Sequence, residues 1–179
     1  MRQVAGCVRK AARVAPMPLS ANQRRTLLGH PAGWIATGFG SGLSPVAPGT
    51  AGSLAALLPW LALRELPLSG YALAVAAAFA LGVWACGWVV AALRLEDPGA
   101  AVWDEFVGLW IALAPLLPHA SGWPWVAAGF ILFRIFDIWK PWPVSWADRR
   151  VGGGFGVMLD DVLAGIYAAL LLGLLLRWQ

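Results

Sequence analysis

The sequence contains few charged residues, two histidines and two cysteines. Only 12% of its 179 residues are charged and 60% are apolar, which lies outside the usual composition of soluble domains. Cys7 and Cys86 lie far apart along the chain and at different expected depths, so they indicate no disulfide, metal site or nucleophile pair. The composition instead indicates one small multi-pass membrane domain.

Four apolar stretches predict the helices of this domain. Residues 71–93 carry no charge over 23 positions, and about 20 apolar residues are enough to cross a bilayer as a helix. Residues 162–176 are shorter, so they either cross a thin bilayer or lie partly buried. Residues 106–133 are interrupted by prolines at their middle and fit a helical hairpin with arms of roughly 18 Å. Residues 51–63 complete five short segments, and we expect an all-α fold with a glycine-rich loop before them.

The cations of the chain predict its orientation. We expect residues 1–29 to be a basic tail and residues 30–179 to be the membrane domain. The first 25 residues carry six cations and no acid, which places the amino terminus in the cytoplasm by the positive-inside rule. If the five segments cross the membrane in alternating directions, residues 94–105 and 134–160 both lie on the cytoplasmic face. The tail itself fits a targeting leader, a disordered arm or an amphipathic helix, and the high pI requires no nucleic-acid partner.

Two adjacent acidic pairs, Asp104-Glu105 and Asp160-Asp161, directly abut apolar stretches. A carboxylate near the hydrocarbon boundary loses solvation worth several kcal/mol, so neighbouring carboxylates need a cation or a raised pKa. Oxygen ligands without nearby Cys or His favour a hard ion such as Mg2+. Each pair alone also fits first-turn residues that complement a helix dipole. Two pairs on one face of the membrane favour a metal site over this alternative.

A cationic segment lies between the two acidic pairs. Arg134 and Asp137 are three residues apart, so they share a helix face and either serve the site or pair with each other. Lys140 precedes Pro141, which predicts an extended conformation and the end of the helix. Lys140 fits either a phosphate contact or an interfacial lysine whose ammonium reaches water.

Two glycine-rich stretches accompany these charged residues. Residues 38–53 have backbone amides that could line an anion, although their composition also fits a plain flexible turn. The stretch is neither a Walker loop nor a dinucleotide fingerprint, because no lysine follows its glycines and no strand precedes it. Residues 152–156 leave the same two alternatives. Tryptophans near the predicted helix ends, Trp60 and Trp103 among them, predict an aromatic belt at the headgroup level.

Four motifs together carry a resemblance to a known family. The sequences GFGSGLSPVAPGTAGS, VWDEFVG, FRIFDIWKPWP and GGGFGVMLDDVLAG occur in this order and spacing. Together they resemble the bacterial phosphatidylglycerophosphatase A family, over roughly residues 30–175. The resemblance implies a Mg2+-dependent lipid phosphatase of the inner membrane, with its active site facing the cytoplasm. Its substrate would be phosphatidylglycerophosphate, which loses its terminal phosphate to give phosphatidylglycerol.

The motifs that carry the resemblance contain the candidate site residues, whose division into roles is our own inference. The candidate catalytic residues are Asp104, Glu105, Asp137, Asp160 and Asp161, of which Asp104, Glu105, Asp160 and Asp161 are the candidate metal ligands. The candidate phosphate-binding residues are Lys140, Arg134, Ser41, Ser44 and Thr50. Direct attack by water and an aspartyl-phosphate intermediate both remain open. The alternative function is a small divalent-cation transporter, although residues 71–93 and 162–176 lack the ionisable groups of a conduction path.

Overall fold

A computed structural model of the protein describes residues 19–95, 98–117 and 122–178. These residues form helices and connecting turns, without any strand, so the expected all-α class is confirmed. The α-helices are α1 Ala21–Leu28, α2 Pro31–Ala36, α3 Pro48–Leu63, α4 Leu68–Leu93, α5 Trp103–Leu113, α6 Trp123–Trp139, α7 Val144–Arg150 and α8 Gly153–Leu176. Two short 3-10 helices, η1 Ser41–Leu43 and η2 Ala114–Leu116, follow α2 and α5.

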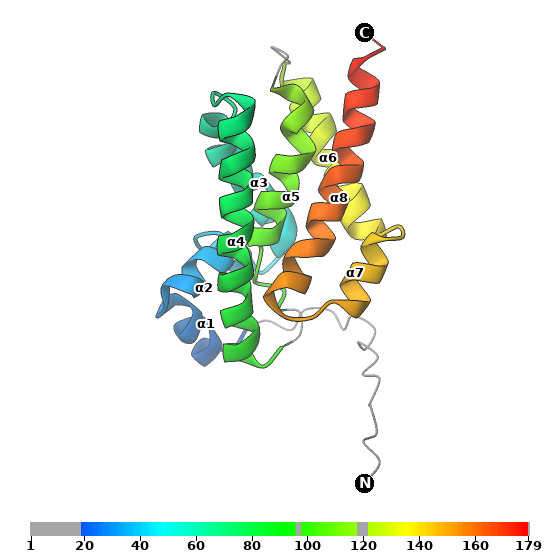
Figure 1. Ribbon diagram of the computed structural model, residues 1–179. Coiled ribbons are helices and arrows are strands. Elements are labelled where there is room, and N and C mark those ends of the chain that lie inside the picture. Colours follow the sequence, from blue (N-terminus) through cyan, green and yellow to red (C-terminus); the bar gives the residue numbers. More distant parts are fainter. Residues whose placement is uncertain (1–18, 96–97, 118–121, 179) are drawn as a thin grey trace.

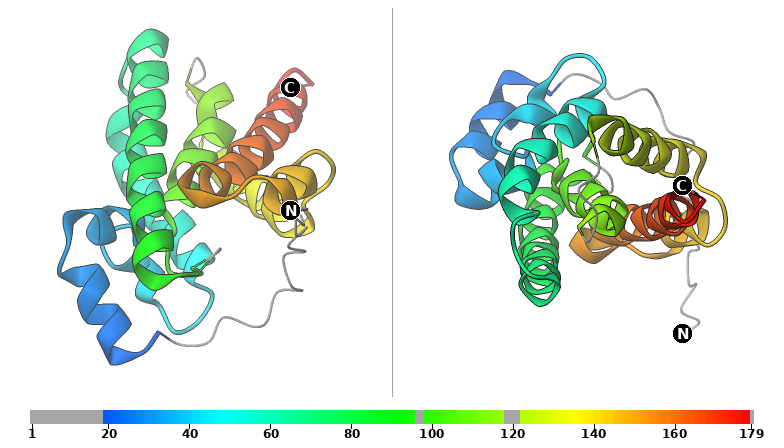
Figure 2. Two further views of the ribbon diagram at one scale, coloured as in Figure 1. Left: turned by 60° about the horizontal axis from the view of Figure 1, so that its bottom comes forward. Right: turned by 90° about the horizontal axis from the view of Figure 1, so that it is seen from above.

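Five of these helices form a bundle in which successive members run in opposite directions. The helices α3, α5 and α8 run one way, and α4 and α6 run the other way (Figure 1). Helix α5 lies at the centre and packs against α3, α4, α6 and α8, as the view from above shows (Figure 2). Helices α1 and α2 pack beside α4, and α7 packs against α8. The α3–α4 turn and the end of α8 therefore lie at one end of the bundle, and α7 and the start of α3 lie at the other end.

Two helices have the length and composition to cross a membrane. These are α4 with 26 residues and α8 with 24 residues, whereas α3 is a shorter apolar helix. Helix α8 begins nine residues before the predicted segment 162–176, so the prediction of its start was wrong. The glycines from Gly153 onward form its first turns, because a Cβ at Gly154 would overlap the backbone of α4 at Val83 and Gly87. Close helix packing accounts for Gly154, whereas Gly153 has a left-handed backbone at φ 68° and a Cβ there would meet open space.

The predicted hairpin is present but its arms are unequal. Helix α5 has 11 residues and continues into η2, and α6 has 17 residues and runs back antiparallel to it. Residues 118–121, where the turn was expected, lie outside the described residues. Helix α6 ends at Trp139 as Pro141 predicts, but Lys140 is left-handed at φ 46° and not extended. Its amide donates to the Phe136 carbonyl at 2.9 Å, which closes the last turn of the helix.

Tryptophans hold the central helix in place. Trp60 and Trp103, expected in an aromatic belt, are 1% and 7% exposed, so that prediction was wrong for both. The Trp103 indole N–H donates to the α4 carbonyl of Ala78, and that of Trp110 donates to the α3 carbonyl of Ala56, both at 2.9 Å. A buried indole N–H needs such a partner. These two bonds fix α5 against α3 and α4.

The expected basic tail is described only in part. Residues 1–18 lie outside the described residues, whereas Ala21–Leu28 form α1. Ser20 and Gln23 close a capping box at the start of this helix, and Leu27 is fully buried. The chain thus packs onto the bundle from α1 onward.

Candidate active site between two helices

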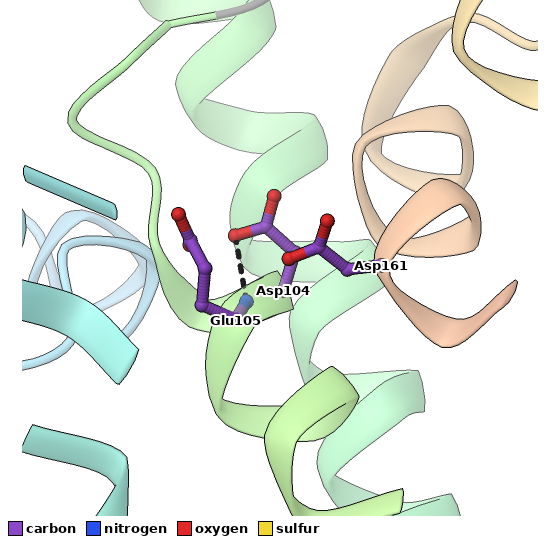
Figure 3. A group of neighbouring side chains, drawn as sticks. All are labelled: Asp104, Glu105 and Asp161. Atoms are coloured by element: carbon purple, nitrogen blue, oxygen red, sulfur yellow. Dashed lines mark hydrogen bonds between the residues drawn. The ribbon is translucent and has the colours of Figure 1, made fainter. Parts of the chain in front are cut away.

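Three acidic side chains converge where α5 meets α8. Asp104 and Glu105 lie in the first turn of α5, and Asp161 lies in the third turn of α8. One carboxylate oxygen from each lies within 4.8 Å of the other two. Figure 3 shows these three side chains on their two helices. The Glu105 amide donates to Asp104 Oδ1 at 3.1 Å. The sequence predicted that the two distant acidic pairs come together, and three of the four acids do so.

A close glycine contact explains the convergence. Gly108 follows Asp104 by four residues, and Gly165 follows Asp161 by the same interval. A Cβ on Gly165 would overlap the backbone of Gly108, and a Cβ on Gly108 would overlap the Asp161 carbonyl and the Phe133 ring. Because residues four apart lie on one helix face, the acids project from the faces that are in closest contact. Small residues at this crossing therefore bring the carboxylates together.

The charge and burial of the three carboxylates favour a bound cation. Glu105 is 9% exposed and Asp161 is 3% exposed. One oxygen of each, Glu105 Oε2 and Asp161 Oδ2, has no hydrogen-bond partner in the described part of the chain. Carboxylates this close together repel one another when all are ionised. Buried carboxylates with orphaned oxygens fit a hard divalent ion, which Asp104, Glu105 and Asp161 could hold.

Arg134 connects the cluster to two other helices. Its Nη1 lies 2.8 Å from Asp137 Oδ2 on the same face of α6 and 3.9 Å from Glu105 Oε1 on α5. The same nitrogen donates to Ser53 Oγ on α3 at 3.4 Å. The pairing of Arg134 with Asp137, one of the two alternatives from the sequence, is thus present. Asp137 contacts this arginine and is not one of the three converging acids.

Asp160 does not join the cluster. Consecutive helical residues point about 100° apart, so Asp160 faces α6 and α7 while Asp161 faces α5. The Asp160 carboxylate pairs with Lys140 Nζ, which also donates to Asp148 Oδ1 at 2.9 Å. Asp160, predicted as a metal ligand, is therefore separate from the set of three. Lys140, predicted as a phosphate contact, is already bound to two carboxylates.

The glycine-rich stretch is half loop and half helix. The Ser41 hydroxyl donates to the Gly38 carbonyl at 2.9 Å, and the Ser44 hydroxyl donates to the Val46 carbonyl at 2.8 Å. These two hydroxyl protons, expected at a phosphate, are used within the loop itself. Thr50 lies in the first turn of α3, so the last six residues of the predicted loop are helical.

The first turn of α3 lies against the acid cluster. A Cβ on Gly49 would crowd Glu105 Oε1 and lie 3.2 Å from both terminal nitrogens of Arg134. The residue before the helix, Ala47, is left-handed at φ 47° and provides no side-chain cap. Uncapped amides at a helix amino terminus favour an anion. An anion placed here would meet these amides and the Arg134 guanidinium together.

Three residues of this region were not predicted from the sequence. Gly49 gives α3 its close approach to Glu105, Ser53 accepts from Arg134, and Asp148 shares Lys140 with Asp160. The repeated spacing of an aspartate four residues before a glycine was visible and would have identified the α5–α8 contact. No sequence signal indicated Asp148, because its partners lie on other elements.

Together, the apolar bundle and its buried carboxylate cluster define a helical protein with a polar site near one end of two membrane-length helices. A model of the Phosphatidylglycerophosphatase A family matches residues 34–176. The chain therefore belongs to the phosphatidylglycerophosphatase A family and is a lipid phosphatase by class. No solved structure matches the chain.

Relatives from three bacteria match most of the chain. Phosphatidylglycerophosphatase A of Escherichia coli (strain K12) is 45% identical over 156 residues, which cover 87% of this chain and 90% of the relative. The protein of the same name from Haemophilus influenzae is 44% identical and covers 84% and 91%. A relative from Bacteroides thetaiotaomicron, provisionally named as a phosphatidylinositol-3-phosphatase, is 47% identical and covers 80% and 92%.

Proposed function

We propose that this protein hydrolyses the terminal phosphate of phosphatidylglycerophosphate in a Mg2+-dependent reaction, giving phosphatidylglycerol and inorganic phosphate. The observation that carries this proposal is the convergence of Asp104, Glu105 and Asp161 within 4.8 Å. The names of the Escherichia coli and Haemophilus influenzae relatives support the choice of lipid. The name of the Bacteroides relative makes phosphatidylinositol 3-phosphate the comparison substrate.

Asp104, Glu105 and Asp161 would hold the magnesium ion. Their oxygens offer a hard, anionic ligand set, and Glu105 and Asp161 are largely buried. When bound, Mg2+ offsets charge on the phosphoryl oxygens and lowers the pKa of a coordinated water. The ion would also relieve the repulsion among the three carboxylates.

The substrate phosphate would lie between the first turn of α3 and Arg134. The amides of this turn point their positive dipole ends toward the same space that Arg134 borders. A guanidinium matches the oxygens of a phosphate monoester with paired donors. In this position the phosphate is next to Glu105, so its reacting phosphorus meets the metal ligands on one side and cationic donors on the other.

Water is the nucleophile that this arrangement favours. Asp137 and Asp160 are paired with Arg134 and Lys140, and the remaining three acids form the ligand set. A water activated by the bound ion needs no carboxylate nucleophile, and acid trapping separates this route from an aspartyl-phosphate formed on the second oxygen of Asp161. The water oxygen bonds to phosphorus, and the bond from phosphorus to the lipid glycerol oxygen breaks. The water loses a proton and the glycerol oxygen gains one, which releases phosphatidylglycerol.

The bundle would cross the bacterial inner membrane several times with its site facing the cytoplasm. The alternating helices and the two membrane-length spans support a multi-pass arrangement. Arg149 and Arg150 lie at the end of the bundle that carries α7, which supports a cytoplasmic position for this end. Asp161 lies eight residues after the start of α8, or about 12 Å along it. A headgroup of the inner leaflet could reach that depth.

Phosphate release from purified protein in detergent tests the function. We expect release from phosphatidylglycerophosphate with Mg2+, loss of release with a chelator, and loss of release in Asp161→Asn. Glu65→Gln is the matched control, because Glu65 is an exposed acid at the opposite end of the bundle. A phosphoenzyme trapped by acid would overturn the water route. Cation flux into liposomes without phosphate release would overturn the enzyme and favour a transporter.

A further inference from the structure

We propose that Lys140, Asp148 and Asp160 form a positioning cluster that fixes the rotation of α8, so that Asp161 points at the other two acids. The three side chains do not contact the substrate in this proposal. It rests on the proposed function, because it assigns Asp161 to the metal site. Asp148 is the new member, and neither the family motifs nor the acid convergence identifies it.

The contacts of Lys140 carry the proposal. Its ammonium pairs with both Asp148 and Asp160, and the exposed fractions of the three side chains are 11%, 18% and 10%. Buried ion pairs of this kind are costly to break, because the remaining charge stays buried without a partner. Withdrawal of Lys140 toward a phosphate would remove its ammonium from both aspartates, of which Asp160 is buried. We therefore infer that the lysine stays with its carboxylates.

The cluster ties together three elements of the fold. Lys140 follows the end of α6, Asp148 lies on α7, and Asp160 lies on α8. The left-handed backbone of Lys140 turns the chain away from the axis of α6, and its side chain then bridges α7 and α8. Helix α7 also packs against α8. The cluster is thus a polar connection between α8 and the segment that precedes it, beside the hydrogen bond from the Tyr167 hydroxyl to the Trp142 carbonyl at 3.0 Å.

Helix geometry links this connection to the acid site. Asp160 and Asp161 are consecutive, so a rotation of α8 moves both carboxylates through the same angle. Side-chain atoms lie about 5 Å from a helix axis, so a rotation of about 20° would move the Asp161 carboxylate by about 2 Å. Metal-ligand distances tolerate only about 0.2 Å. A lost constraint on rotation at Asp160 would therefore weaken cation binding at Asp161.

Asp148→Asn tests the proposal through metal binding, without recourse to turnover. Mn2+ bound to the detergent-solubilised full chain is measured by electron paramagnetic resonance of the free ion. We expect about 10- to 100-fold weaker Mn2+ binding, the range typical of residues that support metal ligands. The Mg2+ concentration for half-maximal phosphate release should rise similarly, while the lipid KM stays near that of the unaltered protein.

Two further variants separate positioning from other roles. Arg150→Gln removes an exposed charge from the same helix and should bind Mn2+ normally. Lys140→Met should weaken Mn2+ binding as Asp148→Asn does, whereas a phosphate contact would raise the lipid KM with Mn2+ binding unchanged. That second result would overturn the proposal.

Separate measurements distinguish misfolding of a variant, and failure of the proposed function, from failure of the positioning proposal. Samples are compared only as monodisperse peaks from gel filtration, and Asp148→Glu, which keeps the charge, should restore most of the Mn2+ affinity if Asp148→Asn folds poorly. Lower thermal stability with normal Mn2+ binding would show a merely structural role and overturn the proposal. If the unaltered protein binds Mn2+ but releases no phosphate, the proposed function fails while the positioning inference is still tested by binding.

Discussion

Gly165→Ala probes the contact that brings the acid cluster together. The new Cβ would overlap the Gly108 carbonyl oxygen and lie 3.1 Å and 3.2 Å from the Gly108 C and Cα atoms. Backbone atoms cannot rotate away as a flexible side chain does, so α5 and α8 must separate by about 1 Å to restore ordinary contact. Asp161, one turn from Gly165, would move away from Asp104 by a similar amount.

The energetic consequences separate stability from activity. Overpacking costs about 1–3 kcal/mol of unfolding free energy, and the higher helix propensity of alanine offsets about 1 kcal/mol of this. The net loss of stability should therefore be small. A displacement of about 1 Å at a reacting centre can reduce the rate by about 100-fold. We expect Gly165→Ala to lose far more activity than stability.

Helix α8 contains a matched control. A Cβ on Gly173 would meet Pro115 at 3.8 Å and 3.9 Å, which is ordinary van der Waals contact. Gly173→Ala should therefore retain activity and unfold at the same or a slightly higher temperature. Both variants are assayed for Mg2+-dependent phosphate release and for thermal unfolding in the same detergent. Equal activity of the two variants would refute the link between the glycine contact and the site.

Three further predictions concern the charges around the site and the anchoring of α5. Arg134→Gln should lower the unfolding free energy by about 3–5 kcal/mol, because Glu105 and Asp137 lose their cation; denaturant titration should show a much smaller loss for Arg134→Lys. Mg2+ at 100 times its Kd should stabilise the protein by about 2.7 kcal/mol in thermal unfolding, and Asp161→Asn should show no such shift. Trp103→Phe should cost about 0.5–1.5 kcal/mol, because the bond from the indole N–H to the α4 carbonyl of Ala78 is lost; an unchanged unfolding temperature would contradict this.

The sequence predicted the helical class and the convergence of acids because both follow from local patterns. Uncharged apolar stretches define helices regardless of their neighbours, and buried carboxylates need a shared partner wherever they occur. The prolines at the middle of 106–133 likewise predicted the reversal between α5 and α6. These features depend on residue type and spacing alone.

The roles of single residues depended on packing that the sequence does not reveal. Asp160 and Asp161 are adjacent in sequence but have different partners. Asp160 pairs with Lys140, whereas Asp161 lies beside Asp104 and Glu105, and which of the two faces α5 depends on how α8 is rotated about its axis. Lys140 was expected at a phosphate because its two carboxylate partners come from other elements. Trp103 was expected at the lipid interface, whereas the α4 carbonyl that accepts its N–H lies 25 residues earlier in the chain.

Helix α5 lies in the interior of the bundle, and the other helices surround it. Nine of its eleven residues are buried, including Glu105. By contrast, α4 and α6 expose large apolar side chains such as Leu73 and Ile131. In the proposed membrane arrangement, apolar exchanges on these two helices should be well tolerated, because fluid hydrocarbon would adapt to the new side chain. On α5 each exchange meets a fixed neighbour, so the shortest helix of the bundle is the one with the least freedom to vary.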